Sequence, residues 1–382
     1  MLTSLRENGP QSRTALAKAT GLAPTSVSLL VDDLARRDLV MTDAVAATGA
    51  RGRPRVGLRL NPAAARVLGI VAADDGLTWA RADLAGAVLE EGRAAAWGQL
   101  PGLEAVAEAI AVVAAAECAA PAPAPLAAVA AAVARPVALD GTVIQVGPQG
   151  VESRPLEPTI RRRLAEGVAF GLHNDANVAA RAEAGALWSR GLGLAGVAYL
   201  KADSGGIGGG VAFPHGVLTG AHGLIGEFGH LPVDPSGAPC PCGGRGCLAQ
   251  HLSLAALEAA AGIPPAGGDA DARVARLVAL AGAGEPAAVA ALDQAGRRLA
   301  TAVSAIMACL DLSTFVLGGY LAPLGPWLLP GLRQALEART SVTGSTPEYH
   351  LGGPAGRAAL KGAVDMAVSA VLEDPTLVRA AG

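Results

Sequence analysis

The chain has 382 residues, of which 51% are hydrophobic, 3% aromatic and 16% charged, and its formal net charge is -3. This composition excludes bulk disorder, because disordered chains combine low hydrophobicity with high net charge, and the length suits two or three domains. The most apolar stretch, residues 119–134, is broken by prolines and is shorter than the ~20 residues that a membrane-spanning helix needs. The chain begins without a secretory signal, so we expect a cytoplasmic protein with no membrane segment.

Charge is unevenly distributed along the chain. Residues 1–62 carry nine basic and five acidic side chains, whereas the remainder carries 21 basic and 28 acidic ones. A small basic module on a larger acidic body is typical of a DNA-binding domain attached to a sensor or an enzyme. Asn61-Pro62 marks a sharp boundary, and we therefore expect a first domain over 1–62 and a second over 63–382.

Residues 12–36 carry the pattern of two short helices joined by a turn. Ser12 can cap the first helix, which would point Leu16 and Ala19 inward. Gly21 turns the chain, and Pro24 suits the first turn of the second helix, where its missing N–H costs nothing. Four apolar residues of that helix recur at helical spacing and predict one buried stripe, namely Val27, Leu30, Val31 and Leu34.

The second of these helices carries small hydroxyl side chains on its opposite face, which can approach a base edge or a phosphate. These residues are Thr25, Ser26 and Ser28. A helix-turn-helix places such a helix in the major groove of DNA. Strands that begin at residue 39 and cover 56–60 enclose a basic loop that looks like a wing, with arginines suited to a narrow minor groove. The loop arginines are Arg51, Arg53 and Arg55. The alternative is a small helical protein-contact module with solvated arginines.

From residue 66 onward, strands alternate with helices. The first series of strands is predicted at 67–73, 79–83, 87–90 and 126–134, with a helix at 103–118. A second series begins near residue 168 and has strands at 197–201 and 209–213, and the final third is helical apart from a strand at 315–317. Alternation of this kind predicts α/β layers in two lobes.

Three of the five cysteines lie within eight residues, close to a histidine. The four candidate ligands are His230, Cys240, Cys242 and Cys247. Zinc takes four tetrahedral nitrogen and sulfur ligands, and no open coordination position is implied, so we expect a structural zinc ion. The alternatives are a disulfide or an unpaired reactive thiol. The other two cysteines, Cys118 and Cys309, lie on apolar stretches and are expected in the core.

Three further groups carry chemical content, each of them weak alone. Asn174 and Asp175 end a predicted strand just before a helix, where an aspartate can accept a proton from a hydroxyl, although such a pair is usually a helix cap. Residues 204–210 form a glycine-rich turn able to approach a phosphate or a sugar. Glu227 lies three residues before the candidate metal ligand His230.

Taken in this order, these groups closely resemble the ROK family of repressors and sugar kinases, over essentially the whole chain. His173 to Asn177 resembles the sugar and catalytic-aspartate motif of the family, residues 226–230 its Glu-x-Gly-His motif, and residues 240–247 its zinc loop. The resemblance implies a winged helix-turn-helix followed by a two-lobed actin-like fold of the sugar kinase and Hsp70 type. It implies a first lobe over about 63–173 plus the C-terminal helix, and a second lobe over about 174–354.

The resemblance also implies that Asn174, Asp175, Glu227 and His230 contact a sugar in the cleft between the lobes. The acid that normally follows the last zinc cysteine is absent, since Ala249 stands there. A charged hydrogen bond of this kind is worth roughly 1.5–3 kcal/mol. We therefore expect the affinity for the ligand, or the identity of the ligand, to differ from that of family members that carry the acid.

The nucleotide motifs depart from the pattern of family kinases. Val71 stands where the phosphate motif has aspartate and Ala73 where it has glycine. Asp74 or Asp75 would substitute only by slipping the strand register. Ser204-Gly205 replaces the first two residues of the second phosphate turn, and Tyr320 puts a bulky ring where a small residue usually admits adenosine. Phosphoryl transfer depends on positioning and charge neutralisation, so we expect no enzyme activity, no ATP, and Asp175 as a vestigial base.

We therefore expect a transcriptional regulator of carbohydrate metabolism, a repressor, that acts as a homodimer or homotetramer on a double-stranded DNA inverted repeat. Its effector would be a sugar or a sugar derivative. Two alternatives remain, namely a ROK sugar kinase with a fused DNA-binding domain and a DNA-binding protein that has lost ligand sensing.

Overall fold

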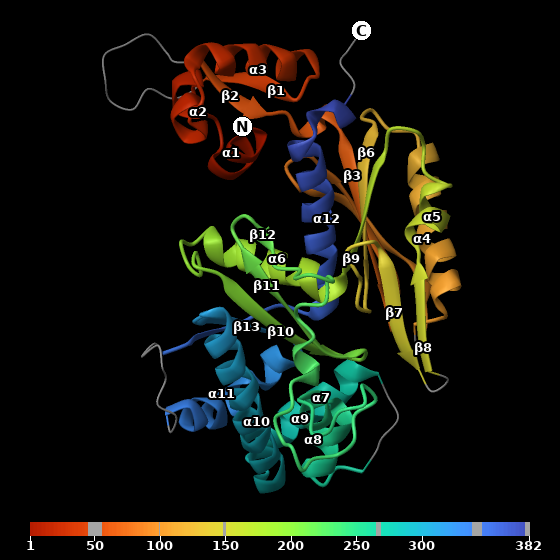
Figure 1. Ribbon diagram of the computed structural model, residues 1–382, viewed down its shortest axis with the longest axis vertical. Coiled ribbons are helices and arrows are strands. Elements are labelled where there is room, and N and C mark those ends of the chain that lie inside the picture. Colours follow the sequence, from red (N-terminus) through yellow and green to blue (C-terminus); the bar gives the residue numbers. More distant parts are fainter. Residues whose placement is uncertain (45–55, 99, 148–149, 265–268, 338–345, 379–382) are drawn as a thin grey trace.

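The N-terminal unit of the computed structural model has three helices and a two-stranded sheet in its described residues, 1–44 and 56–60 (Figure 1). The structure describes residues 1–44, 56–98, 100–147, 150–264, 269–337 and 346–378. The elements of this unit are α1 (Leu2–Asn8), α2 (Arg13–Thr20), α3 (Pro24–Arg36), β1 (Val40–Ala44) and β2 (Val56–Leu60). Ser12 caps α2 by accepting a hydrogen bond from the Ala15 N–H, and Pro24 opens α3. The predicted pair of helices is confirmed.

The buried stripe of this unit is narrower than its sequence pattern predicts. Val27, Val31 and Leu34 of α3 are buried, whereas Leu30 is 45% exposed. Ala19 of α2 is exposed as well. The inward orientation predicted for Leu30 and Ala19 is therefore wrong, because so small a unit covers only one line of side chains on each helix.

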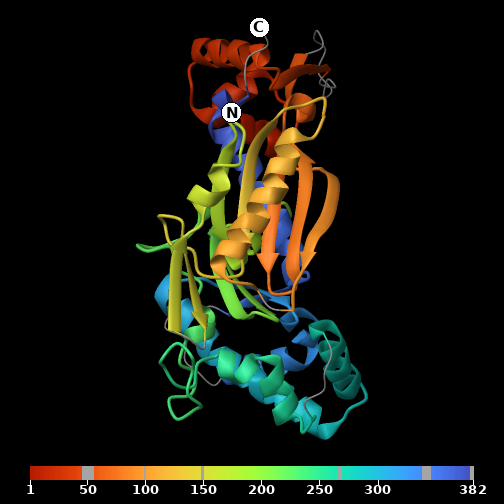
Figure 2. The ribbon, with the colours of Figure 1, turned by 90° about the vertical axis from the view of Figure 1, so that its right-hand side faces the viewer.

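The first lobe is a five-stranded sheet with the strand order β5-β4-β3-β6-β9. Its strands are β3 (Arg66–Ala73), β4 (Gly76–Asp83), β5 (Val88–Ala96), β6 (Leu126–Val133) and β9 (Ala169–Asn174). The central strands β3 and β6 are parallel and buried almost throughout, as expected for strands covered on both faces. Helices α4 (Leu103–Ala119) and α5 (Glu157–Arg161) lie on the outer face of this sheet (Figure 2).

The second lobe repeats the topology of the first, with the strand order β12-β11-β10-β13-β14. Its strands are β10 (Val197–Asp203), β11 (Gly206–Phe213), β12 (Gly216–Val217), β13 (Thr314–Gly319) and β14 (Glu348–Leu351). Along each of these strand orders, the first two pairs of neighbouring strands are antiparallel and the last two are parallel. The prediction of α/β layers in two lobes is confirmed.

Helices cover both faces of the second sheet. Those of the outer layer and the metal-loop region are α7 (Ala249–Leu252), α8 (Leu254–Ala260), α9 (Ala270–Gly282), α10 (Pro286–Leu310) and α11 (Leu321–Glu337). The two helices between the sheets are α6 (Asp175–Trp188) and α12 (Ala355–Glu373). Short 3-10 turns are η1 (Pro62–Ala64), η2 (Phe228–His230) and η3 (Pro375–Leu377).

Helices α6 and α12 pack against each other at very short range. Gly362 of α12 lies so close to α6 that a β-carbon built on it would stand 1.9 Å from the carbonyl oxygen of Val178. On its other side α12 approaches β3, where a β-carbon on Gly69 would stand 2.8 Å from the Val364 nitrogen. Helix α12 thus contacts the first sheet and α6 at the same time.

The N-terminal unit docks on the far end of α12, near the C-terminus of the chain (Figure 1). Leu2 and Leu5 of α1 belong to one hydrophobic cluster with Val368 and Val371 of α12. Two polar contacts flank this cluster. The guanidinium of Arg6 donates to Asp365 at 2.5 Å, and that of Arg37 donates to the Val378 carbonyl at 3.1 Å.

Several elements were not predicted. The hairpin of β7 (Thr142–Gly147) and β8 (Gly150–Pro155) and the edge strand β14 lie in segments without a clear apolar alternation. Cys309 is exposed near the end of α10 and Cys118 is half-buried, so the core placement predicted for Cys309 is wrong.

Among the described residues no single helix has the length and apolarity to cross a membrane, although the bent pair of α9 and α10 meets that test jointly.

Candidate functional site

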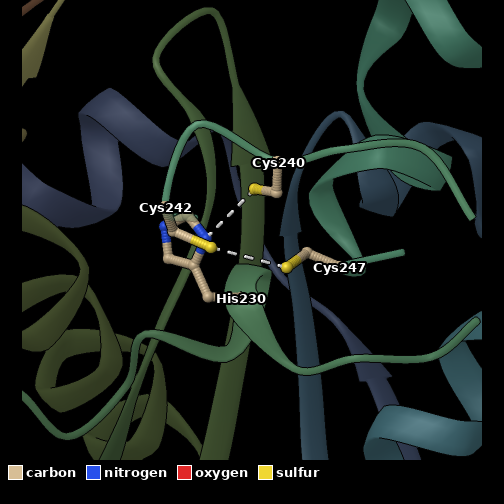
Figure 3. A group of neighbouring side chains, drawn as sticks. All are labelled: His230, Cys240, Cys242 and Cys247. Carbon is tan, nitrogen blue, oxygen red and sulfur yellow. Dashed lines mark hydrogen bonds between the residues drawn. The ribbon is translucent and has the colours of Figure 1, made fainter. Parts of the chain in front are cut away.

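The predicted metal ligands converge where the end of η2 meets the loop that follows it (Figure 3). The ligand atoms of His230, Cys240, Cys242 and Cys247 all lie within 4.8 Å of one another. The Cys240 sulfur is 3.6 Å from the His230 Nδ1, and the Cys242 sulfur is 3.6 Å from that of Cys247. Three thiols and one imidazole at these distances suit tetrahedral coordination, so the cluster could hold a metal ion.

The loop closes tightly because glycine permits it. Gly246 has a φ of +58°, and a β-carbon there would stand 1.5 Å from the carbonyl oxygen of Asp234.

The backbone N–H of Gly244 lowers the pKa of Cys242, whereas burial raises the pKa of Cys247 to about 12. A metal ion would displace the remaining thiol protons as it binds.

Asn174 and Asp175 stand at the junction between β9 and α6. Asn174 is the N-cap of α6, because its side-chain oxygen accepts from the Asn177 N–H at 3.0 Å and its amide donates to the Arg135 carbonyl at 3.0 Å. The usual capping role of such a residue is thus present. Asp175 is the first residue of the helix and its side chain is only 7% exposed.

Asp175 belongs to a buried ion cluster that includes Lys201 and Asp203 of β10. The Lys201 ammonium donates to Asp175 Oδ2 at 2.5 Å and also to Asp203. Burial alone would lower the pKa of Lys201, but the charges of Asp175 and Asp203 outweigh burial and raise it. Lys201 is therefore charged, and its charge opposes the burial that raises the pKa of Asp175.

The glycines of β11 let the segment with Glu227 approach this cluster. A β-carbon on Gly209 would stand 2.5 Å from the Phe228 ring, and one on Gly226 would stand 2.2 Å from the Gly209 carbonyl oxygen. Burial raises the pKa of Glu227, and the charge of Asp175 raises it further. The charge of Asp175 therefore acts on Glu227. Most of the glycine-rich stretch is strand, and its turn spans only 203–206.

Asp74 follows β3 and reaches toward the second lobe. Its carboxylate pairs with Arg135 at 3.1 Å and accepts from the Leu100 N–H at 3.2 Å. The Asp74 Oδ2 atom would stand 3.1 Å from a β-carbon on Gly205, in the turn between β10 and β11. Asp74 therefore comes to this turn from just beyond the end of β3, with no slip of the strand register.

The side chains predicted to contact DNA lie on α3 and in the segment that follows β1. Thr25 and Ser26 are exposed. Ser28 is half-buried, and its hydroxyl donates to the Pro24 carbonyl at 3.1 Å. Arg51, Arg53 and Arg55 lie outside the described residues.

Lys201 and Asp203 were missed by the sequence reasoning. A signal for them exists, since Lys201 interrupts the apolar run of β10 and is one of only three lysines in the chain. A lysine inside a buried strand needs a carboxylate partner. The partner Asp175 lies 26 residues earlier, and only the placement of α6 over β10 brings the two together.

Comparisons with known proteins place these features in context. Residues 79–367 match the model of the ROK family. The chain is 33% identical over 183 residues to an N-acetylmannosamine kinase of Citrobacter koseri, a match that covers 47% of this chain and 60% of that protein. The chain thus spans less than two thirds of the curated relatives it matches.

Solved structures share the fold. A ROK family transcriptional regulator, described as a homolog of the E. coli MLC protein, matches with a TM-score of 0.72 at 24% identity and covers 96% of both chains. The ROK hexokinase of Thermus thermophilus matches with a TM-score of 0.61 at 28% identity and covers 80% of this chain and 99% of its own. The predicted two-lobed actin-like sugar kinase fold is confirmed.

The prediction that the chain is not an enzyme is contradicted by these relatives, several of which are sugar kinases. The structure gives a physical reason for the error. Tyr320 is buried, and its hydroxyl donates to the Leu252 carbonyl at 2.9 Å inside the second lobe. Asp74 reaches the turn at Gly205. That prediction rested on three departures from the kinase motifs. Two of them, at Asp74 and at Tyr320, are placed differently in the structure than the sequence suggested.

Proposed function

Because the chain belongs to the ROK family, we propose that it is a cytoplasmic transcriptional regulator of carbohydrate metabolism, acting as a repressor that binds operator DNA and a sugar effector. In this proposal residues 1–62 bind DNA and residues 63–382 sense the sugar, with lobes over about 63–173 plus α12 and about 174–354. The protein acts as a homodimer or homotetramer on an inverted repeat, so that the spacing between two copies of α3 matches the half-sites.

The observation that carries the proposal is the N-terminal unit itself. Three helices and a hairpin, with Thr25 and Ser26 exposed on α3, are docked on a sugar kinase fold. The fold of the ROK regulator extends over 96% of this chain, whereas that of the hexokinase covers 80%. The match to the regulator leaves 4% of this chain uncovered, which is much less than the length of residues 1–60. The matching part of the regulator's fold therefore includes most of the N-terminal unit.

A route from the sugar to the DNA follows from the packing. Asp175 begins α6, α6 packs on α12 at Gly362, and the N-terminal unit docks on the far end of α12. A sugar held by Asn174, Asp175, Glu227 and His230 would favour one angle between the lobes. Half-sites are read only at a spacing of about 34–36 Å or its multiples, so a small rotation of α12 releases the DNA. Such a shift requires that the sugar bind the two states with different affinities.

We propose zinc as the ion of the His/Cys cluster, because three thiolates and an imidazole are its preferred structural ligands. Zinc would link His230, at the end of η2, to the loop with Cys240, Cys242 and Cys247. Glu227 immediately precedes η2. The ion would thus hold in place the segment that presents Glu227 to the sugar.

The DNA-binding proposal is tested by fluorescence anisotropy with duplex DNA from the region upstream of the encoding gene, at two salt concentrations. We expect tight, salt-sensitive binding that exceeds binding to a scrambled duplex. Ser26→Glu places a negative charge on α3 and should weaken binding by at least about tenfold. Thr3→Glu makes the same charge change at an exposed position of α1 and serves as the matched control. Equal affinity of wild type for both duplexes, or equal loss in both variants, contradicts the proposal for this DNA.

A second candidate function is sugar phosphorylation, favoured by the match to N-acetylmannosamine kinases. In that function Asp175 would accept the proton of a sugar hydroxyl. The test is release of ADP from ATP by wild type in the presence of N-acetylmannosamine, with Asp175→Asn as the control. ADP release that requires both the sugar and Asp175 supports this function, and no difference between the two proteins counts against it.

A further inference from the structure

Leu29 of α3 is the most exposed large hydrophobic side chain among the described residues, since 73% of its surface is accessible. Single exposed apolar residues are common on proteins and need no function. Leu29, however, lies on the helix for which we propose DNA binding, at the end of the molecule opposite to the second lobe (Figures 1 and 2). Its position on that helix therefore decides whether it can reach a ligand.

The helical repeat places Leu29 at the centre of the exposed face of α3. Val27, Val31 and Leu34 are buried and define the inward face of the helix. At about 100° per residue, Leu29 lies almost directly opposite to this stripe. Thr25, which is also exposed, precedes Leu29 by one turn on the same face. The outward side of the first two turns of α3 thus presents a threonine and then a leucine.

Carboxylates limit how the rest of this face can approach DNA. Asp32 and Asp33 occupy the following turn, and their side chains are 66% and 41% exposed. Arg13 of α2 pairs with Asp32 at 3.4 Å, and Arg36 pairs with Asp33 at 3.0 Å, so guanidiniums that could bind phosphate are engaged by these carboxylates. Phosphate groups repel carboxylates, and recognition helices contact base edges with their N-terminal residues. Both arguments favour an approach through the first two turns of α3.

An uncharged branched side chain has one specific partner in the major groove. Every base pair presents hydrogen-bonding groups there, and thymine alone adds a methyl group, at C5. Leu29 can neither donate nor accept a hydrogen bond, so a polar base edge placed against it would lose its water without gaining a partner. Contact with the thymine methyl group instead removes apolar surface from water on both molecules.

We propose that Leu29 is a specificity-determining residue that reads thymine in the operator through an apolar contact with its 5-methyl group. This inference rests on the proposed function, because it assigns a base preference to the same DNA-binding helix. Each half-site then contains an A·T pair, with its thymine methyl group toward α3, at the position that Leu29 contacts.

The experiment compares two duplexes with the sequence upstream of the encoding gene, one made with thymidine and one with deoxyuridine at every thymidine position. Deoxyuridine pairs with adenine in the same way and lacks only the methyl group. The proteins are wild type, Leu29→Ala, Leu29→Met and Leu30→Ala. The last is the matched control, because it makes the same change at a 45% exposed neighbour that lies about 100° around the helix. Fluorescence anisotropy gives the dissociation constant of each protein for each duplex.

The quantity compared is the ratio of the dissociation constant for the deoxyuridine duplex to that for the thymidine duplex. For wild type we expect a ratio of at least about four, which corresponds to one buried methyl group. Leu29→Ala should lower this ratio by about fourfold, because the shorter side chain no longer reaches the methyl group. Leu29→Met keeps a long apolar side chain and should keep the wild-type ratio, as should Leu30→Ala. Effects of deoxyuridine on the DNA itself are common to all four proteins and cancel in the comparison.

Four results overturn the inference. An equal ratio for wild type and Leu29→Ala means that Leu29 does not contact thymine, while DNA binding itself stands. An equal fall in Leu30→Ala means that the contact is not specific to the Leu29 face. A changed oligomeric state of Leu29→Ala in sedimentation velocity, with an unchanged ratio, assigns this leucine to an interface between copies of the chain. If wild type binds the upstream duplex no better than a scrambled one, the DNA-binding part of the proposed function fails together with this inference. Circular dichroism checks that the variants fold, as expected for changes at so exposed a position.

Discussion

The contact between α6 and α12 leads to a sharp prediction for Gly362→Ala. The added methyl group would stand 1.9 Å from the Val178 carbonyl oxygen, where an ordinary contact begins at 3.4 Å. The two helices would have to separate by about 1.5 Å, and gaps of even 0.5–1 Å forfeit about a quarter to a half of a van der Waals contact. Forcing extra atoms into such a contact costs about 1–3 kcal/mol, and the obstacle here is backbone that cannot rotate away.

Part of that cost is offset, because alanine is a better helix former than glycine by about 1 kcal/mol. The packing cost lies at the upper end of its range because the obstacle is backbone, so we expect Gly362→Ala to lower the free energy of unfolding by about 2 kcal/mol. The matched control is Gly185→Ala in α6, where no atom lies within 4 Å of the new methyl group. There only the helix-propensity gain remains, so this variant should be more stable than wild type by about 0.5–1 kcal/mol.

The assay is urea unfolding followed by circular dichroism and by tryptophan fluorescence, so that separate transitions of the lobes are detected. The expected order of midpoints is Gly185→Ala above wild type and Gly362→Ala below it. If Gly362→Ala were as stable as Gly185→Ala, the two helices would not be in the close contact described, and the route from Asp175 to the N-terminal unit would lose its main link.

Three further predictions concern the metal loop, a buried ion pair and a half-buried histidine. Cys247→Ser should reduce bound zinc from about one equivalent per chain to near zero, measured by atomic absorption. Glu117→Gln should cost about 3–5 kcal/mol of stability in thermal unfolding, because it leaves Arg66, which is 5% exposed, without its carboxylate. The exposed pair of Glu108 is the control, and Glu108→Gln should cost less than about 1 kcal/mol. Burial lowers the pKa of His173 from 6.5 to about 4, so the unfolded chain binds its proton more readily. Wild type should therefore lose stability as the pH falls from 6.5 toward 4, and His173→Gln should lose less over that window.

Local signals in the sequence predicted local structure well. Ser12 and Pro24 gave the starts of α2 and α3, and Asn174 gave the start of α6, because caps depend on residues within one helical turn. The four metal ligands were also found, since their spacing is short and their chemistry specific. These features depend on neighbours along the chain, so one sequence suffices to predict them.

What escaped prediction depends on contacts distant along the chain. Leu30 has the spacing of a core residue, yet it is 45% exposed. Tyr320 was expected beside the nucleotide position, but its ring turns into the second lobe and its hydroxyl bonds to Leu252. Lys201 meets Asp175 only because α6 lies across β10. In each case the deciding partner is set by the register of a sheet or by the packing of a helix, neither of which leaves a local pattern.

The docking of the N-terminal unit on α12 has a consequence for the order in which the protein is made. The ribosome synthesises Leu2 and Leu5 long before Val368 and Val371, which belong to the same hydrophobic cluster. A nascent chain therefore holds an N-terminal unit whose apolar face stays uncovered until α12 has been made. A chain that stops before α12 lacks this cover, so α3 is presented on a packed support only once α12 has been synthesised.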